Sequence, residues 1–185
     1  PPRLPEMAVF SDQPSLAKVS AGLRGIRPSI NRTPSPQDYI EDHQNVARLI
    51  TTAAFGRAMP NFTTAPKRPP SNEPVRLYHA PPHGLLDGLE HPFVPHYLVN
   101  IEPVLKRKQR MLACHQSQFS WLDDTQSMSS PIAEMNHQAS ELAKQGGRFA
   151  YAEGWRRHNS LGFCPPESDP LAEHLGELIQ KLETK

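Results

Sequence analysis

The 185-residue sequence predicts an α/β fold with a small, mostly parallel sheet flanked by helices. Segments with helical apolar spacing alternate along the chain with short segments whose composition is typical of strands. The length suits one domain with a sizeable core, and we expect residues 1–185 to form it. The 21 prolines indicate long irregular connections between the regular elements.

The N-terminal segment predicts a helix followed by a short strand. Ser15 is placed to cap the helix and Pro28 to end it. The apolar face of this helix consists of Leu16, Val19, Leu23 and Ile26. Residues 29–33 (SINRT) predict a strand that is more polar than a buried parallel strand usually is. A loop over residues 33–41 leads to the next helix.

The segment PQDYIEDHQNVARLITTAAFGRAM, residues 36–59, predicts the central helix of the fold. The helix is expected to begin around Asp42. Its apolar face consists of Val46, Leu49, Ile50 and Ala53. His43 falls in the first turn, close in sequence to Asp38, Glu41 and Asp42. A histidine on such a helix start fits a metal ligand, and it also fits an ordinary capping or surface role.

Residues 60–75 contain too many prolines for a helix or strand and predict an extended surface loop. Strands are expected at residues 76–80 (RLYHA) and 96–101 (HYLVNI), joined by a loop rich in proline and glycine. The histidines in this region are His79, His83, His91 and His96. Their spacings match no helical metal motif, so we interpret them as ordinary loop histidines, and recruitment to a zinc ion is the alternative.

The C-terminal half predicts three more helices. The first covers residues 103–121, and Lys108 and His115 lie on one face of it. The simpler interpretation is that Lys108 extends to solvent and that His115 caps the helix. The second stops at Gly146-Gly147, and residues 148–153 return as a strand or extended chain. The apolar positions of this second helix are Ile132, Met135, Ala139 and Leu142. Residues 165–185 carry the last helix, whose apolar side is Leu171, Leu175, Leu178, Ile179 and Leu182.

Composition excludes several classes of protein. The net charge of +1 and the short basic run at residues 106–110 argue against nucleic-acid binding. No apolar run approaches the roughly 20 residues of a membrane span, and no signal peptide is expected. The two cysteines form no CxxC motif or disulfide framework, so a reducing, cytoplasmic location is expected.

Three separated stretches match one pattern. Residues 26–50, IRPSINRTPSPQDYIEDHQNVARLI, follow the form RPD-φφφ-TH-SPQDYHPDH, where φ is apolar. Residues 106–123, KRKQRMLACHQSQFSWLD, follow K-x-x-A-L-x-x-H-x-SQ, and residues 149–158, FAYAEGWRRH, contain an AEGF-like element. Their order and spacing agree over residues 26–163, and together they resemble the PIG-L/LmbE-like family of metal-dependent N-deacetylases.

The resemblance implies a Rossmann-like sheet flanked by helices, lacking the family's N-terminal strand and helix. It implies hydrolysis of an N-acyl group, commonly on an N-acetylglucosamine derivative, at a single divalent metal ion, typically zinc. Such an ion acidifies a bound water and polarises the amide carbonyl. The expected partner is therefore a small molecule, an acylated amino sugar or a related amide.

The resemblance also assigns residues. His43 occupies the last position of HPDH, which implies a metal ligand, and Asp42 is expected to support catalysis from beside it. His115 is expected near the reacting group, and Tyr39 and Lys108 near the substrate.

Two departures qualify this assignment. The family's AHPDDE motif, which supplies two metal ligands and the catalytic aspartate, does not occur, and Ile40 replaces the first histidine of HPDH. We therefore expect an incomplete part of a deacetylase, whose unpartnered strand edge favours a homo-oligomer. The alternative is a non-catalytic relative that serves as a sugar-binding or protein-interaction module.

Overall fold

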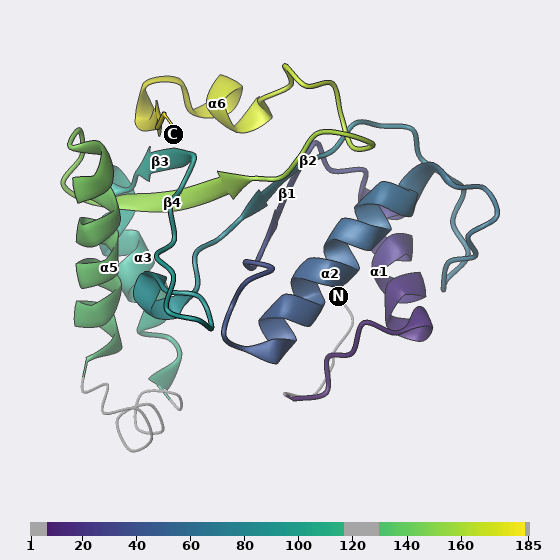
Figure 1. Cartoon of the computed structure of the whole chain (residues 1–185), viewed down its shortest axis with the longest axis horizontal. Helices are drawn as coiled ribbons and strands as arrows, with labels where there is room; N and C mark the ends of the chain where they lie inside the picture. The colour runs from purple at the N-terminus through teal and green to yellow at the C-terminus, as the bar shows by residue number, and fades with distance from the viewer. Residues whose placement is uncertain (1–6, 117–129, 184–185) are drawn as a thin grey trace. The chain divides into compact units, whose positions relative to one another are not determined.

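The structure is a computed structural model that describes residues 7–116 and 130–183. Its chain divides into two compact units, Pro1–Val94 with Trp155–His174, and Pro95–Gly154 with Leu175–Lys185. Five strands alternate with helices, so the predicted α/β class is confirmed (Figure 1). The prediction of a single domain stays a prediction.

The first unit places two helices beside two parallel strands. Its elements are α1 (Gln13–Ile26), β1 (Ile30–Thr33), α2 (Glu41–Phe55), β2 (Arg76–His79), the second half of β4 (Ala152–Arg157) and most of α6 (Pro170–Leu175), with short 3-10 turns at Gly56–Ala58 and His83–Leu85. Helices α1 and α2 lie side by side (Figure 1). Strand β2 pairs in parallel with β1, Thr33 opposite His79, and antiparallel with β4, His79 opposite Arg156.

The first helix differs in detail from its prediction. Its cap is Asp12, whose carboxylate accepts the backbone N–H of Ser15 at 2.8 Å, so the expected capping role of Ser15 is wrong. Its buried positions are Ala17, Ser20, Ala21 and Arg24. Ile26, expected on the apolar face, is exposed. Small residues leave room for the neighbouring helix, whereas Arg24 is buried because its guanidinium donates to backbone carbonyls.

Two arginines, the buried Arg24 and the half-buried Arg57, hold the proline-rich loop in place. Arg24 donates to carbonyls between residues 56 and 68, including those of Met59 at 2.7 Å and Phe62 at 3.0 Å. Arg57 donates to the carbonyls of Glu73 and Phe163, both at 2.7 Å. Residues 60–75 contain no helix or strand, as predicted. The loop is therefore anchored on its inner side by charge-assisted hydrogen bonds.

The second unit combines two helices with short antiparallel strands. Its elements are β3 (Tyr97–Asn100), α3 (Leu105–Leu112), α5 (Pro131–Gly146), the first half of β4 and β5 (Ile179–Lys181), with 3-10 turns at Glu102–Val104 and Gly176–Leu178. Helix α5 has the predicted stop, because Gly147 takes a left-handed conformation at φ 69°. Strands β3 and β5 pair antiparallel, with Val99 opposite Ile179.

Three predictions about elements are wrong in part. The strands are not mostly parallel, since β1–β2 is a parallel pair whereas β2–β4 and β3–β5 are antiparallel. The last helix does not run through residues 165–185, because Gly176 breaks it at φ 50° and Ile179 enters a strand. The helix over residues 103–121 ends at Leu112, and its predicted residues 117–121 lie outside the described part.

The described part of the chain contains no helix with the length and apolar character that crossing a bilayer requires.

Candidate functional site

An open pocket of about 560 Å³ lies in the first unit, where β1 and β2 end. It is lined by Arg32, Thr33, Pro34, Asp38, His43, Ala80, Pro81, His83 and Trp155. The carboxyl ends of neighbouring parallel strands are the usual ligand position in α/β folds, because loops diverge there and leave a crevice. The pocket is therefore the first candidate for a functional site.

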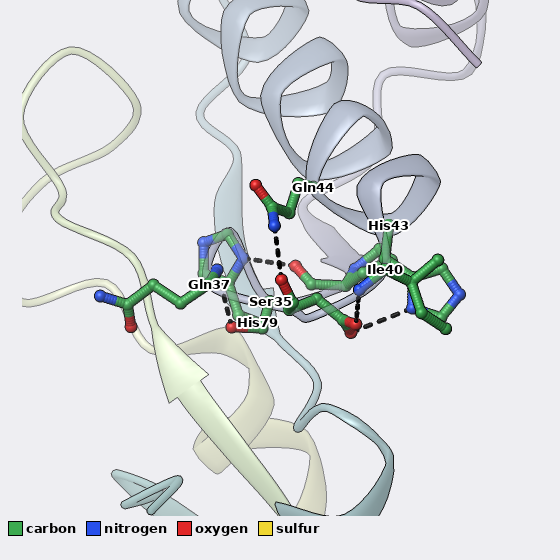
Figure 2. A network of polar contacts seen from close by, with 8 residues as sticks. Ser35, Gln37, Ile40, His43, Gln44 and His79 are labelled. Carbon is green, nitrogen blue, oxygen red and sulfur yellow. Dashed lines mark hydrogen bonds and ion pairs between the residues drawn. The ribbon is translucent and has the colours of Figure 1, made fainter. Parts of the chain in front are cut away.

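A tight turn between β1 and α2 places Asp38 in the wall of this pocket. Its carboxylate Oδ1 accepts the backbone N–H of Ile40 at 2.9 Å, the local bond by which an aspartate closes a turn on itself. The Ser35 carbonyl accepts the N–H of Asp38 at 3.3 Å, and the Gln44 side chain donates to the carbonyl of Asp38. The first bond holds the carboxylate, and the other two hold the backbone of Asp38 in the turn, where Figure 2 labels Ser35, Ile40 and Gln44.

His43 is oriented by this buried carboxylate. Its Nδ1 lies 3.0 Å from Asp38 Oδ2, and only 2% of the aspartate side chain is exposed against 44% of the histidine. An ionised carboxylate only accepts hydrogen bonds, so Nδ1 of His43 donates and Nε2 keeps its lone pair. A carboxylate behind an imidazole is also the usual support of a metal-binding histidine. His43 therefore offers one directed nitrogen at the pocket.

The turn is also held from β2 by a buried histidine. His79 Nδ1 lies 2.9 Å from the carbonyl of Pro34, and Figure 2 shows His79 beside the turn. Nε2 of His79 lies 3.0 Å from Nδ1 of His158. The carbonyl fixes the direction of both bonds: His79 donates to Pro34 and accepts from His158. Burial lowers the pKa of both imidazoles, and the nearby Arg156 charge lowers that of His79 further.

Three more residues give the pocket its polar and aromatic character. The guanidinium carbon of Arg32 lies 5.5 Å from the centroid of the Trp155 ring. Thr33 is only 4% exposed, and its hydroxyl is a buried polar atom without a hydrogen-bond partner in the described part of the chain. A buried unpaired hydroxyl is costly unless something outside the fold satisfies it.

The three predicted site residues of the first unit have different surroundings in the structure. His43 lines the pocket, as its predicted role requires. The Asp42 carboxylate accepts the backbone N–H groups of Met7 at 2.7 Å and Val9 at 3.3 Å, so it supports the N-terminal chain, and Asp38 takes the position beside His43. Tyr39 is half exposed outside the pocket lining, and burial followed by the Asp38 charge raises its pKa.

The other two predicted residues belong to the second unit. Lys108 makes an ion pair of 2.9 Å with Glu153. His115 is exposed and follows the end of α3, so the prediction that it continues the helical face of Lys108 is wrong. Neither residue is part of the pocket in the first unit, and the roles assigned to them stay predictions.

Sequence reasoning missed several residues of the pocket. Arg32, Thr33 and Trp155 carry no motif, and only the fold brings them together. Asp38 carried a usable signal, because an aspartate two residues before a helix start often closes a turn there. His79 lies in the strand predicted over residues 76–80, which β2 confirms, whereas its interpretation as a loop histidine is wrong because it is buried there.

The donors present do not make a complete metal centre. A catalytic zinc takes about three protein ligands and leaves one position open. His43 supplies one directed nitrogen, while both oxygens of Asp38 already accept hydrogen bonds. Residues 7–116 and 130–183 contain no group of three or more histidine, cysteine, aspartate or glutamate side chains arranged to hold an ion. The described residues therefore do not fit zinc on their own.

No protein-family model matches the chain, and neither does any curated protein. Several solved structures share its fold. A conserved protein from Thermus thermophilus superposes with a TM-score of 0.67 at 20% identity, over 90% of this chain and 67% of its own. The 4-carboxy-2-hydroxymuconate hydratase from Pseudomonas putida gives 0.59 at 15% identity, over 85% and 61%.

The third is N,N′-diacetylchitobiose deacetylase from Pyrococcus horikoshii, solved with an inhibitor, with a TM-score of 0.62 at 18% identity over 87% of this chain and 57% of its own. The chain thus spans between 57% and 67% of the length of these three proteins. At such low identity the likeness concerns the backbone. The chain has the α/β fold that a deacetylase and a hydratase both use.

Proposed function

We propose that this chain is part of an enzyme that hydrolyses the N-acyl group of an amino sugar or a related amide. The observation that carries the proposal is the pocket at the strand ends, where a buried aspartate directs one nitrogen of His43. The fold shared with a diacetylchitobiose deacetylase and the resemblance of residues 26–50 to the PIG-L/LmbE-like pattern support the same class of reaction. A cytoplasmic location and a homo-oligomer remain predictions.

The arrangement gives His43 a definite chemical role. Because Nδ1 donates to Asp38, the lone pair of Nε2 can accept a proton or bind an electrophile. When a proton reaches Nε2, the Asp38 carboxylate stabilises the imidazolium across 3.0 Å. In amide hydrolysis this pair is suited to move a proton between the attacking water and the leaving amine.

Zinc binding at His43 is an alternative to this proton transfer, because the Nε2 lone pair that would bind the ion is the one that accepts the proton. The described residues hold no group of three or more possible ligands, so a zinc ion would need further donors besides His43.

The test is acetate release from N,N′-diacetylchitobiose and N-acetylglucosamine by the full-length protein, with and without added zinc. We expect His43→Ala to lower kcat/KM by roughly 10²- to 10⁴-fold, the usual contribution of a proton-transferring group. His91→Ala is the matched control, because His91 also pairs with an aspartate but lies outside the pocket lining. Equal activity of both variants and the unchanged protein would contradict the proposal.

A sugar-binding module without catalysis is the second candidate. The incomplete set of metal donors and the indole of Trp155 in the pocket wall favour it, because aromatic faces stack on apolar faces of sugars. Under this reading His43→Ala weakens sugar binding, and no acetate is released by any form of the protein.

A further inference from the structure

We propose that this pocket takes a substrate bearing an anionic group, a carboxylate or a phosphate, and that Arg32 binds that group beside Trp155. The proposal deepens the proposed function and rests on it for the identity of the site. It predicts that the pocket binds anionic ligands more tightly than neutral ones, and this difference can be measured by binding alone.

Arg32 differs in its bonding from several other arginines of the chain. Arg24, Arg57 and Arg76 are committed to backbone carbonyls, and Arg148 pairs with Glu177 at 2.9 Å. In the described residues Arg32 has neither a hydrogen bond nor an ion pair, and its contact is the face of Trp155. Its guanidinium therefore keeps its donors for a ligand in the pocket that it lines.

The second feature is the charge balance of the pocket lining. Asp38 is the carboxylate of this lining, and both of its oxygens accept hydrogen bonds from His43 and Ile40. Arg32 has no ion-pair partner in the described part of the chain, and the formal charge of Asp38 balances its own at the level of the whole lining. An anion meets attraction from Arg32, while the competing carboxylate is turned inward and buried.

The contact with Trp155 prepares the guanidinium for this task. A guanidinium held over a ring by a cation–π contact loses part of its rotamer freedom before the ligand arrives, so less entropy is lost on binding. Its edge can still present two parallel N–H groups, the geometry that matches the paired oxygens of a carboxylate or phosphate. A flexible surface lysine would offer neither advantage.

Thr33, the next residue of β1, lines the same pocket and carries a polar group that the described part of the chain does not satisfy. Its hydroxyl is unpaired although the residue is 4% exposed, and Thr33 lines the pocket together with its neighbour Arg32. The cost of this unpaired group is recovered when a ligand oxygen accepts its proton. The pocket thus offers a cation from one residue and a hydroxyl from the next.

The experiment measures binding to the full chain by isothermal titration calorimetry at low salt. The probes are N-acetylglucosamine, N-acetylglucosamine 6-phosphate and N-acetylmuramic acid, which present no charge, a phosphate and a carboxylate. We expect at least one anionic probe to bind about tenfold more tightly than the neutral sugar, the value of one charge-assisted hydrogen bond. Arg32→Gln should remove the difference, and Arg32→Lys should restore part of it.

Arg148→Gln is the matched control, because Arg148 also stacks on an aromatic ring, Phe149, but already pairs with Glu177. It should leave the preference intact. Equal binding of all three probes, or a preference that survives Arg32→Gln in a variant with an unchanged circular dichroism spectrum, overturns the proposal. Anion binding through Arg32 without acetate release would refute the hydrolase and keep the anion site. Acetate release that depends neither on Arg32 nor on the charge of the probe would refute the anion site and keep the hydrolase.

Discussion

Two aspartate–histidine pairs in the first unit have the same local chemistry and different surroundings. In Asp38–His43 the carboxylate and Nδ1 are 3.0 Å apart, and in Asp87–His91 they are 3.1 Å apart. Each aspartate also accepts a backbone N–H two residues ahead, from Ile40 and Leu89 respectively. The difference is burial, since 2% of the Asp38 side chain is exposed against 18% of Asp87.

The comparison shows that a local turn sequence is enough to form an aspartate–histidine pair. The surrounding fold determines whether the histidine of that pair faces a pocket. Asp87 closes an exposed loop, where backbone N–H bonds from His91 and Leu89 lower its pKa, and 70% of its histidine is exposed. Asp38 sits at the ends of β1 and β2 with a helix behind it, so its histidine faces a pocket.

The largest effect is expected from removing the buried carboxylate. Asp38→Ala leaves the N–H of Ile40 and Nδ1 of His43 without their acceptor, which should lower the free energy of unfolding by roughly 1–3 kcal/mol. Asp87→Ala should lower it less, because the bonds of Asp87 to Leu89 and His91 lie in an exposed loop where water replaces them. The measurement is urea denaturation of the 185-residue chain and both variants. Equal losses for the two variants would break the comparison.

How far the sequence predicts this fold depends on which residues determine each element. Helix α2 was predictable because Leu49 and Ala53 recur at helical spacing and are buried. Strand β5 was not, because Ile179 also fits a helical face together with Leu175, and only its pairing with β3 decides between the two structures. The strand directions likewise follow from long-range pairing that apolar spacing does not encode.

The site shows the same limit. His43 was predicted from its place in a motif at a helix start, and the structure does put it in the pocket. Asp42 was chosen over Asp38 because it is adjacent in sequence, but the helix directs it to Met7 and Val9. Trp155 comes from the distant strand β4, and no local pattern connects it with Arg32.

The second prediction extends the comparison to pH, through the buried histidine that holds the same turn. Burial lowers the pKa of His79 below its usual 6.5, and the Arg156 charge lowers it too, whereas the bond to Pro34 raises it. The unfolded chain therefore binds more protons than the folded chain below about pH 6.5, so stability falls as pH falls through that range. His158, whose pKa is lowered by burial and by His79, acts in the same direction.

The measurement is the melting temperature from about pH 8 to about pH 5. We expect a plateau above about pH 7 and a decline below about pH 6.5, and the decline should become shallower in His79→Gln. His91→Gln, at the exposed pair, should leave the profile unchanged, because the imidazole is mostly in water. A profile that His79→Gln does not alter would show that other groups control the acid response.

The smallest effect concerns how the carbonyl of each aspartate is satisfied. The carbonyl of Asp87 accepts a backbone N–H, that of Glu90, at 3.1 Å, whereas the carbonyl of Asp38 accepts from the Gln44 side chain. Gln44→Ala should therefore loosen the buried turn, at a cost of about 0.5–1.5 kcal/mol. Gln145→Ala, at an exposed position of α5, measures the stability gained from the higher helix propensity of alanine, and this gain is subtracted from the effect of Gln44→Ala.

Amide hydrogen exchange at Ile40 should accelerate in Gln44→Ala and not in Gln145→Ala, because the loosened turn exposes the Ile40 N–H that Asp38 holds. Unchanged exchange at Ile40 would mean that the turn is held by Ser35 and His79 without help from α2.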